Sequence, residues 1–154
     1  MLSFVKLLSA AAAAIHAQDP NDPPVYPTAP FVDCGSEGFN ITAAYFQQLS
    51  ASKMINGFDA VATADLSNAT FSVSVQYPGE KPSAHSFGVC TVARFGIDGF
   101  PHCPWKPGTK LHIIDKNPAK YEGPAEYEST WKMVDSENNT LFCMKTNWTL
   151  HPMA

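Results

Sequence analysis

The sequence predicts an all-β sandwich of about seven strands. Short runs of alternating apolar and polar residues recur along the chain, polar turns separate them, and almost no segment has helical periodicity. The distance from one turn to the next is typical of sandwich domains. We expect strands at residues 39–46, 58–66, 70–77, 85–95, 110–115, 126–135 and 141–150. Residues 43–54 are ambiguous, because their composition also permits a short helix.

The alternation assigns side chains of the early strands to faces, because successive side chains in a strand point to opposite sides of the sheet. Residues 58–66 place four on one face: Phe58, Ala60, Ala62 and Ala64. Residues 70–77 also place four on one face: Phe71, Val73, Val75 and Tyr77. The alanines fit close packing between sheets, and they equally leave room for a bound ligand. The alternation alone does not separate these two interpretations.

The stretch WKMVDSENNTLFCMKTNW (131–148) predicts a hairpin, because the polar turn DSENNT separates two alternating runs. One face of this hairpin carries mainly large side chains: Trp131, Met133, Phe142, Met144, Thr146 and Trp148. Asn147 begins a glycosylation pattern and needs solvent, so its neighbour Trp148 is expected to point inward. Periodicity alone predicts an ordinary core on this face.

The N-terminus has the layout of a secretory signal peptide over residues 1–17, with a buried helix as the alternative. Lys6 precedes an apolar run, and small residues lead to Ala17. Residues 18–30 follow as a proline-rich leader without a core of its own. Residues 31–154 are long enough for one domain. We therefore expect a protein that is secreted or located in the endosomal or lysosomal lumen.

Cysteines and glycosylation patterns agree with export. The chain has four cysteines, and in an exported protein an even number implies disulfides, for which three connectivities remain open. Four asparagines begin N-x-S/T patterns and are expected to carry glycans. These are Asn40, Asn68, Asn138 and Asn147.

Composition and motifs argue against several function classes. The net charge is −4 and no cluster of lysine and arginine is present, so nucleic acid is not an expected partner. The histidines lack metal-binding spacing, and no nucleophile elbow occurs. Asp115, Glu122, Glu126 and Glu128 could supply paired carboxylates, but acidic residues are common on exposed strand faces. We expect no catalytic residue, no metal and no cofactor.

Three stretches of the chain, FVDCGSEG (31–38), CPWKPGTKL (103–111) with KNPAKYEGP (116–124), and TWKMVDSENNTLFC (130–143), follow one another at a recognisable spacing. In order and separation they resemble the ML domain, the MD-2-related lipid-recognition family. The resemblance implies an immunoglobulin-like β-sandwich that holds a sterol, fatty acid or phospholipid in a cavity between its sheets. It also implies disulfides Cys34–Cys143 and Cys90–Cys103. We further expect a monomer that contacts a membrane or receptor transiently for delivery.

The resemblance turns the large-residue face of the hairpin into a cavity wall and makes residues 118–124 the rim of its mouth. The lipid-contacting residues that it implies are Ala60, Ala62, Phe71, Val73, Val75, Pro118, Ala119, Tyr121, Tyr127, Trp131, Met144, Thr146 and Trp148. The alternative function is a secreted sandwich that binds a protein partner, such as a receptor or an immune component. It would require an exposed apolar patch, for which Phe95, Phe100 and Tyr121 are the candidates.

Overall fold

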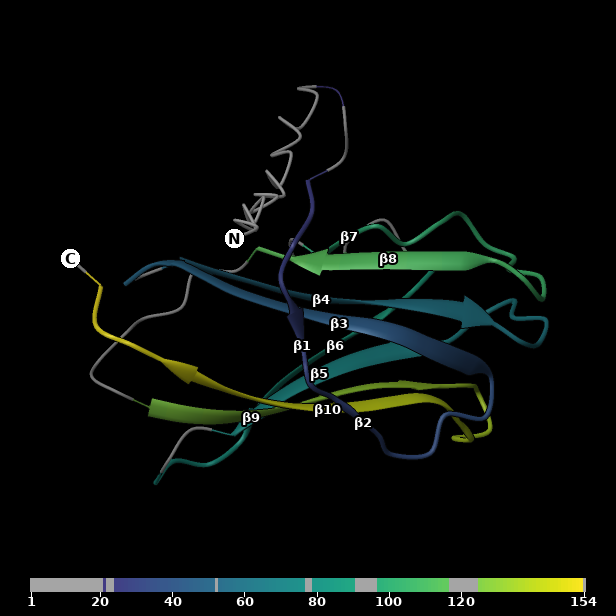
Figure 1. Cartoon of the computed structure of the whole chain (residues 1–154). Coiled ribbons are helices and arrows are strands. Elements are labelled where there is room, and N and C mark those ends of the chain that lie inside the picture. The colour runs from purple at the N-terminus through teal and green to yellow at the C-terminus, as the bar shows by residue number, and fades with distance from the viewer. Residues whose placement is uncertain are drawn as a thin grey trace, which may run out of the picture.

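The computed structural model describes residues 21, 24–51, 53–76, 79–90, 97–116 and 125–153, which form two antiparallel sheets packed face to face (Figure 1). The first sheet contains, in spatial order, β1 (Thr28–Ala29), β3 (Phe39–Ser50), β4 (Lys53–Ala62), β8 (Lys110–Asp115) and β7 (Ile97–Asp98). The second sheet contains β2 (Val32–Asp33), β10 (Thr140–Leu150), β9 (Ala125–Val134), β5 (Thr70–Gln76) and β6 (Ser83–Gly88). The predicted all-β sandwich is confirmed. Among the described residues seven strands are long, and three have two residues each.

Three predicted elements differ from the structure in their type or their bounds. The helix considered for residues 43–54 is wrong, because β3 continues to Ser50 and β4 already begins at Lys53. Cross-strand pairing of Gln48 with Met54 carries the ladder almost to the turn, and this pairing outweighs the local helix propensity. The strand predicted at 58–66 instead ends at Ala62, so Ala64 lies outside it and is exposed.

The strand predicted at 85–95 corresponds to β6, which ends at Gly88. Cys90 therefore follows the strand in a turn instead of lying within it, and its side chain is exposed. Residues 91–95 of the predicted strand lie outside the described residues, as does Tyr77 of the strand predicted at 70–77.

The end of the predicted leader and the first residues of the domain together join the two sheets. β1 pairs with β3 of the first sheet, and three residues later β2 pairs with β10 of the second sheet. Next to β2, the disulfide Cys34–Cys143 fixes the chain to β10, and the Cys34 amide donates a hydrogen bond of 2.9 Å to the Cys143 carbonyl. The second disulfide is Cys90–Cys103. Both pairings agree with those that the family resemblance implies.

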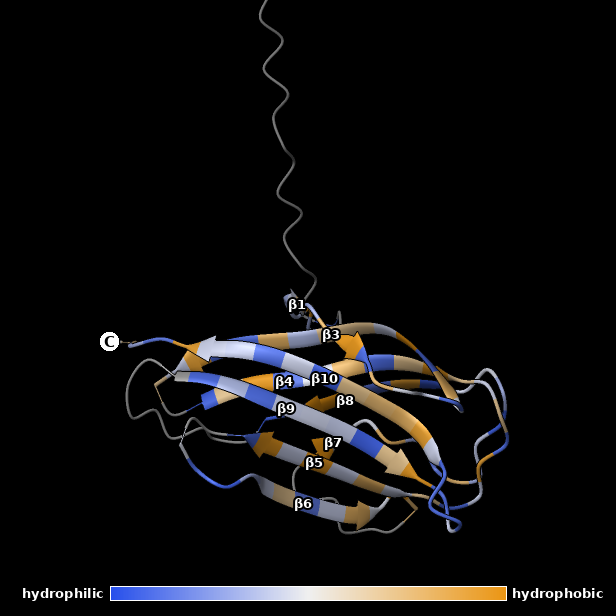
Figure 2. Cartoon of the chain, turned by 90° about the horizontal axis from the view of Figure 1, so that it is seen from below, coloured by the Kyte–Doolittle hydropathy of each residue, from blue (hydrophilic) through white to orange (hydrophobic). Residues whose placement is uncertain are grey.

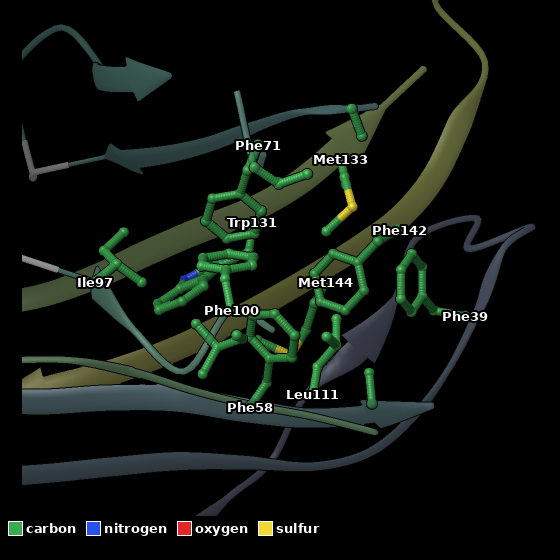
Figure 3. Packing of buried hydrophobic residues seen from close by; sticks show 14 of the residues in the cluster. Phe39, Phe58, Phe71, Ile97, Phe100, Leu111, Trp131, Met133, Phe142 and Met144 are labelled. Carbon is green, nitrogen blue, oxygen red and sulfur yellow. The ribbon is translucent and has the colours of Figure 1, made fainter. Parts of the chain in front are cut away.

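The two sheets enclose a core of aromatic and aliphatic side chains, the main cluster (Figure 3). Phe58 and Leu111 of the first sheet point toward Trp131, Phe142 and other side chains of the second sheet. The ring centroids of Phe58 and Phe142 are 4.4 Å apart, and those of Phe58 and Trp131 are 5.5 Å apart. Rings at such distances contribute dispersion and quadrupole attraction beyond the area they bury, so this part of the core is firmly packed.

Solvent-facing positions alternate with core positions along β9 and β10, and in Figure 2 hydrophilic blue bands alternate with paler ones along the middle of these strands. All four asparagines of the glycosylation patterns have exposed side chains. These are Asn40, Asn68, Asn138 and Asn147. Glycosylation itself stays a prediction.

Candidate functional site

The inward face of the β9–β10 hairpin holds the predicted cavity-wall residues. Trp131, Met144, Thr146 and Trp148 are all buried, and Trp131 pairs with Met144 across the two strands. Trp131 and Met144 belong to the main cluster, where they contact other apolar side chains of both sheets. Alternation therefore correctly oriented this face.

Other predicted site residues line the same interior. Four of them are buried members of the main cluster: Ala60, Ala62, Phe71 and Val73. Val75 is half-buried and packs against the main cluster and also against a second, smaller one. The predicted rim residues Pro118, Ala119 and Tyr121 lie outside the described residues.

The smaller cluster, here called the end cluster, consists of Met54, Tyr127, Trp148 and Leu150. It lies at the end of the sandwich where β3, β8 and β10 finish and β4 and β9 begin (Figure 1). Phe46 of the first sheet packs against it and stacks on Trp148 of the second sheet, with ring centroids 5.1 Å apart and an interplanar angle of 12°. Tyr127 stacks on Trp148 at 6.4 Å. A stack of three rings thus connects the two sheets at this end.

Four polar side chains, here called the polar layer, also lie in the interior between the two clusters, which Val75 bridges. The sequence predicted only Thr146 among them. Asn56 and Asp115 pair across β4 and β8, and both are buried. Ser129 and Thr146 pair across β9 and β10, and both are buried. Each of the four stands two residues from a cluster member on its own strand and therefore points to the same face, into the space between the sheets. Asn56 was missed because it precedes the predicted start of its strand at Phe58.

Hydrogen bonding in this layer is uneven. The indole N–H of Trp131 donates to Ser129 Oγ at 2.7 Å. Thr146 and Trp148 have the same spacing as Ser129 and Trp131, so a similar hydrogen bond would be expected. Trp148 Nε1 is nevertheless buried without a hydrogen-bond partner among the described residues. Asn56 Oδ1 is the other buried side-chain atom of the described residues in this state. One donor and one acceptor are therefore left unpaired in the interior.

A pocket of about 510 Å³ lies at the β5, β9 and β10 strands. Exposed polar side chains, among them Glu126, Glu128 and the expected glycan acceptor Asn147, line it together with Tyr127 and Trp148 of the end cluster. This mixed lining differs from the apolar cavity between the sheets that the family resemblance implies.

A hydrogen-bonded group of side chains occupies the outer face of the first sheet. The Tyr45 hydroxyl donates to the Asp59 carboxylate, and His112 Nδ1 contacts the other oxygen of the same carboxylate. Partial burial and the Asp59 carboxylate raise the pKa of Tyr45 to about 12. Tyr26 of the leader stacks on His112 at 6.5 Å, so this group helps to fix the leader to the sheet.

Two further features bear on the kind of site. Within the described ranges, no three histidine, cysteine, aspartate or glutamate side chains gather closely enough to hold a metal ion. The described part of the chain also has no helix of the length and apolarity that a membrane span requires.

Comparison with known proteins finds a likeness of fold among solved structures. No protein-family model and no curated protein matches the sequence. Among solved structures, the chain is similar to a Niemann–Pick type C2 protein from the Japanese carpenter ant, with a TM-score of 0.57 and 16% sequence identity. The similarity covers 78% of this chain and 98% of that one. The protein therefore has a β-sandwich fold like that of a Niemann–Pick type C2 protein.

Proposed function

We propose that the protein is a member of the ML family that binds one apolar lipid between its two sheets and carries it outside the cytosol. The observation that carries this proposal is the end cluster, a separate apolar interior at one end of the sandwich. The likeness of the whole fold to a Niemann–Pick type C2 protein and the two disulfides of the chain support the same proposal. Export, glycosylation and transfer of a sterol are parts of the proposal.

The end cluster suits a binding site because its packing is replaceable. A stacked ring pair contributes on the order of 1 kcal/mol beyond the area it buries, and a lipid that enters between Phe46 and Trp148 replaces ring–ring contacts by ring–lipid contacts. The lipid itself gains about 25 cal/mol for each Å² of apolar surface removed from water. The side chains of the main cluster need not move apart completely, since the end cluster lies where β8 ends and β9 begins, the two strands between which the predicted rim stands in the sequence.

The alternative of a protein-binding sandwich gains no support from the described residues. Phe100 was expected to contribute to an exposed apolar patch, but it is buried in the main cluster between Phe71 and Trp105. Phe95 and Tyr121, the other residues of the expected patch, lie outside the described residues.

The first test is to purify the protein from a eukaryotic secretion host and to identify the lipids that accompany it by mass spectrometry. We expect one equivalent of an apolar lipid, or uptake of one equivalent when lipids are added. A protein that neither carries nor takes up lipid would contradict the proposal.

A variant locates the site. Trp148→Ala removes a ring of the end cluster, and we expect lipid affinity to fall roughly 10- to 100-fold, because one buried large side chain contributes about 1.5–3 kcal/mol. Lys132→Ala, whose side chain is exposed on β9, is the control and should leave the affinity unchanged. Equal effects of the two substitutions in a fluorescent-lipid titration would contradict the placement of the site.

A further inference from the structure

The interior of the sandwich contains two buried polar atoms without a hydrogen-bond partner, one donor and one acceptor. Asn56 is 8% exposed and Trp148 is 7% exposed, and neither Asn56 Oδ1 nor Trp148 Nε1 has a partner among the described residues. Leaving a buried donor or acceptor unpaired costs about 1–3 kcal/mol, and the large majority of such atoms in proteins are paired. Two of them in one region therefore indicate a missing partner.

Contacts with Phe46 bring these two residues into the same region. Asn56 is the direct cross-strand partner of Phe46, and the Phe46 ring stacks on the indole of Trp148 at 5.1 Å. Met54 reinforces this placement, because it shares the inward face of β4 with Asn56 and belongs to the end cluster with Trp148. The unpaired atoms therefore face the region where the polar layer meets the end cluster.

The two atoms have opposite requirements. Trp148 Nε1 can only donate a hydrogen bond, whereas Asn56 Oδ1 can only accept one. A hydroxyl group does both, since its oxygen accepts and its proton is donated. An ether or ester oxygen would satisfy the indole alone, and a hydrocarbon would satisfy neither atom.

We propose that the lipid bound between the sheets carries an alcohol group, and that this group is recognised inside the sandwich by Trp148 Nε1 and Asn56 Oδ1. The inference rests on the proposed lipid-binding function and specifies its ligand. The hydroxyl is held at the polar layer, and the hydrocarbon part of the lipid contacts the rings of the end cluster. Recognition by two buried atoms gives selectivity, because a ligand without the hydroxyl leaves them unpaired.

The test is a ligand series measured by displacement of the fluorescent probe N-phenyl-1-naphthylamine from the full secreted protein. The competitors are dodecan-1-ol, its methyl ether and dodecane, which have the same chain but differ in donor and acceptor capacity. We expect the alcohol to bind roughly tenfold more tightly than the ether, since one buried hydrogen bond of about 1.4 kcal/mol corresponds to that factor. Dodecane should bind most weakly of the three.

Two variants assign the selectivity to the two atoms. Asn56→Leu keeps the approximate volume and removes the acceptor, so the preference for the alcohol over the ether should disappear. Trp148→Phe keeps a ring and removes the donor. The affinities for the alcohol and the ether should therefore fall by a similar factor, while the affinity for dodecane should not change. Lys132→Ala is the matched control and should keep the wild-type order.

Several outcomes would overturn the inference. Equal affinities for the three competitors in the unmodified protein would show that the two atoms do not read a hydroxyl, for example because a water molecule pairs with both. Persistence of the alcohol preference in Asn56→Leu would exclude Asn56 as the acceptor. Failure of all competitors to bind would overturn the proposed function as well, and this result differs from equal binding. Should Asn56→Leu not fold, the unmodified protein and Trp148→Phe still decide.

Discussion

At the scale of single residues, Asp135 determines the turn between β9 and β10. Its Oδ1 atom accepts hydrogen bonds from the backbone amides of Glu137 and Asn139, at 2.9 and 2.8 Å, and its Oδ2 atom accepts one from the Asn139 side-chain amide at 2.9 Å. An aspartate that binds amides a few residues ahead stabilises a turn, and Asn138 accordingly adopts a positive φ of 66°. The turn thus aligns the two strands that carry Trp131 and Trp148.

The same hydrogen bonds make the stability of the hairpin depend on pH. The side-chain amide and the backbone amide of Asn139, with that of Glu137, lower the pKa of Asp135 below its ordinary value of 3.8. A lowered pKa in the folded state stabilises the fold above the ordinary value, and this contribution is lost as the pH falls through the folded-state pKa. In Asp135→Ala we therefore expect a flatter acid limb when the free energy of unfolding is plotted against pH.

Denaturant unfolding at a series of pH values from neutral to strongly acidic would measure this effect. Ser136→Ala, in the same turn, removes no hydrogen bond to the carboxylate and should retain the wild-type slope. Identical acid limbs for the unmodified protein and Asp135→Ala would show that the turn does not act through the charge of Asp135.

At the scale of elements, alternation predicted where the long strands lie, but not the bounds of β3, β4 and β6. The β9–β10 hairpin is a clear case, because Trp131 and Trp148 lie inward as their spacing and the Asn147 pattern predicted. The polar layer was not predictable in the same way, since Asn56, Ser129 and Asp115 occupy inward positions with side chains that usually mark the solvent face. The lipid-contacting residues therefore remain predictions, although most of the described ones share one interior.

Gly57 explains how β4 and β8 come close together. A Cβ atom at this position would lie 2.1 Å from the Ile113 carbonyl oxygen and 2.9 Å from Ile114 Cδ1. Since the nearest atom belongs to the backbone, the two strands would have to move apart. We expect Gly57→Ala to lower the free energy of unfolding by about 3 kcal/mol, the upper part of the range for overpacking.

The matched control is Gly108→Ala, at a position where a Cβ meets nothing within 4 Å and only the positive φ of 89° is unfavourable. That backbone cost should be about 1–2 kcal/mol. Chemical denaturation measures both values, and a smaller effect for Gly57→Ala than for Gly108→Ala would contradict the close approach of the strands.

At the scale of the whole molecule, the two disulfides close loops of very different length. Cys34 and Cys143 are 109 residues apart in sequence, whereas Cys90 and Cys103 are 13 apart. In the chain-entropy model the long loop is worth about 4–5 kcal/mol and the short one about 3 kcal/mol. We expect the double variant Cys34→Ala/Cys143→Ala to lose more stability than Cys90→Ala/Cys103→Ala.

Thermal and denaturant unfolding of both double variants would test this order. The first disulfide also anchors β2, so its removal should release β2 from the second sheet. Hydrogen exchange should then rise at the backbone amide of residue 34, which donates to the carbonyl of residue 143. The opposite order of stability would show that native-state contacts around Cys90–Cys103 outweigh loop length.

The path of residues 28–33 bears on how a ligand would enter the sandwich. Residues 28–33 hydrogen-bond to β3 on one sheet and to β10 on the other, which joins the sheets along one long edge. Along the opposite edge, β6 of the second sheet continues in sequence to β7 of the first. The chain thus connects the two sheets on both flanks. If the sandwich binds a lipid as proposed, we therefore expect the lipid to enter lengthwise, parallel to the strands, and a long, narrow lipid to fit best.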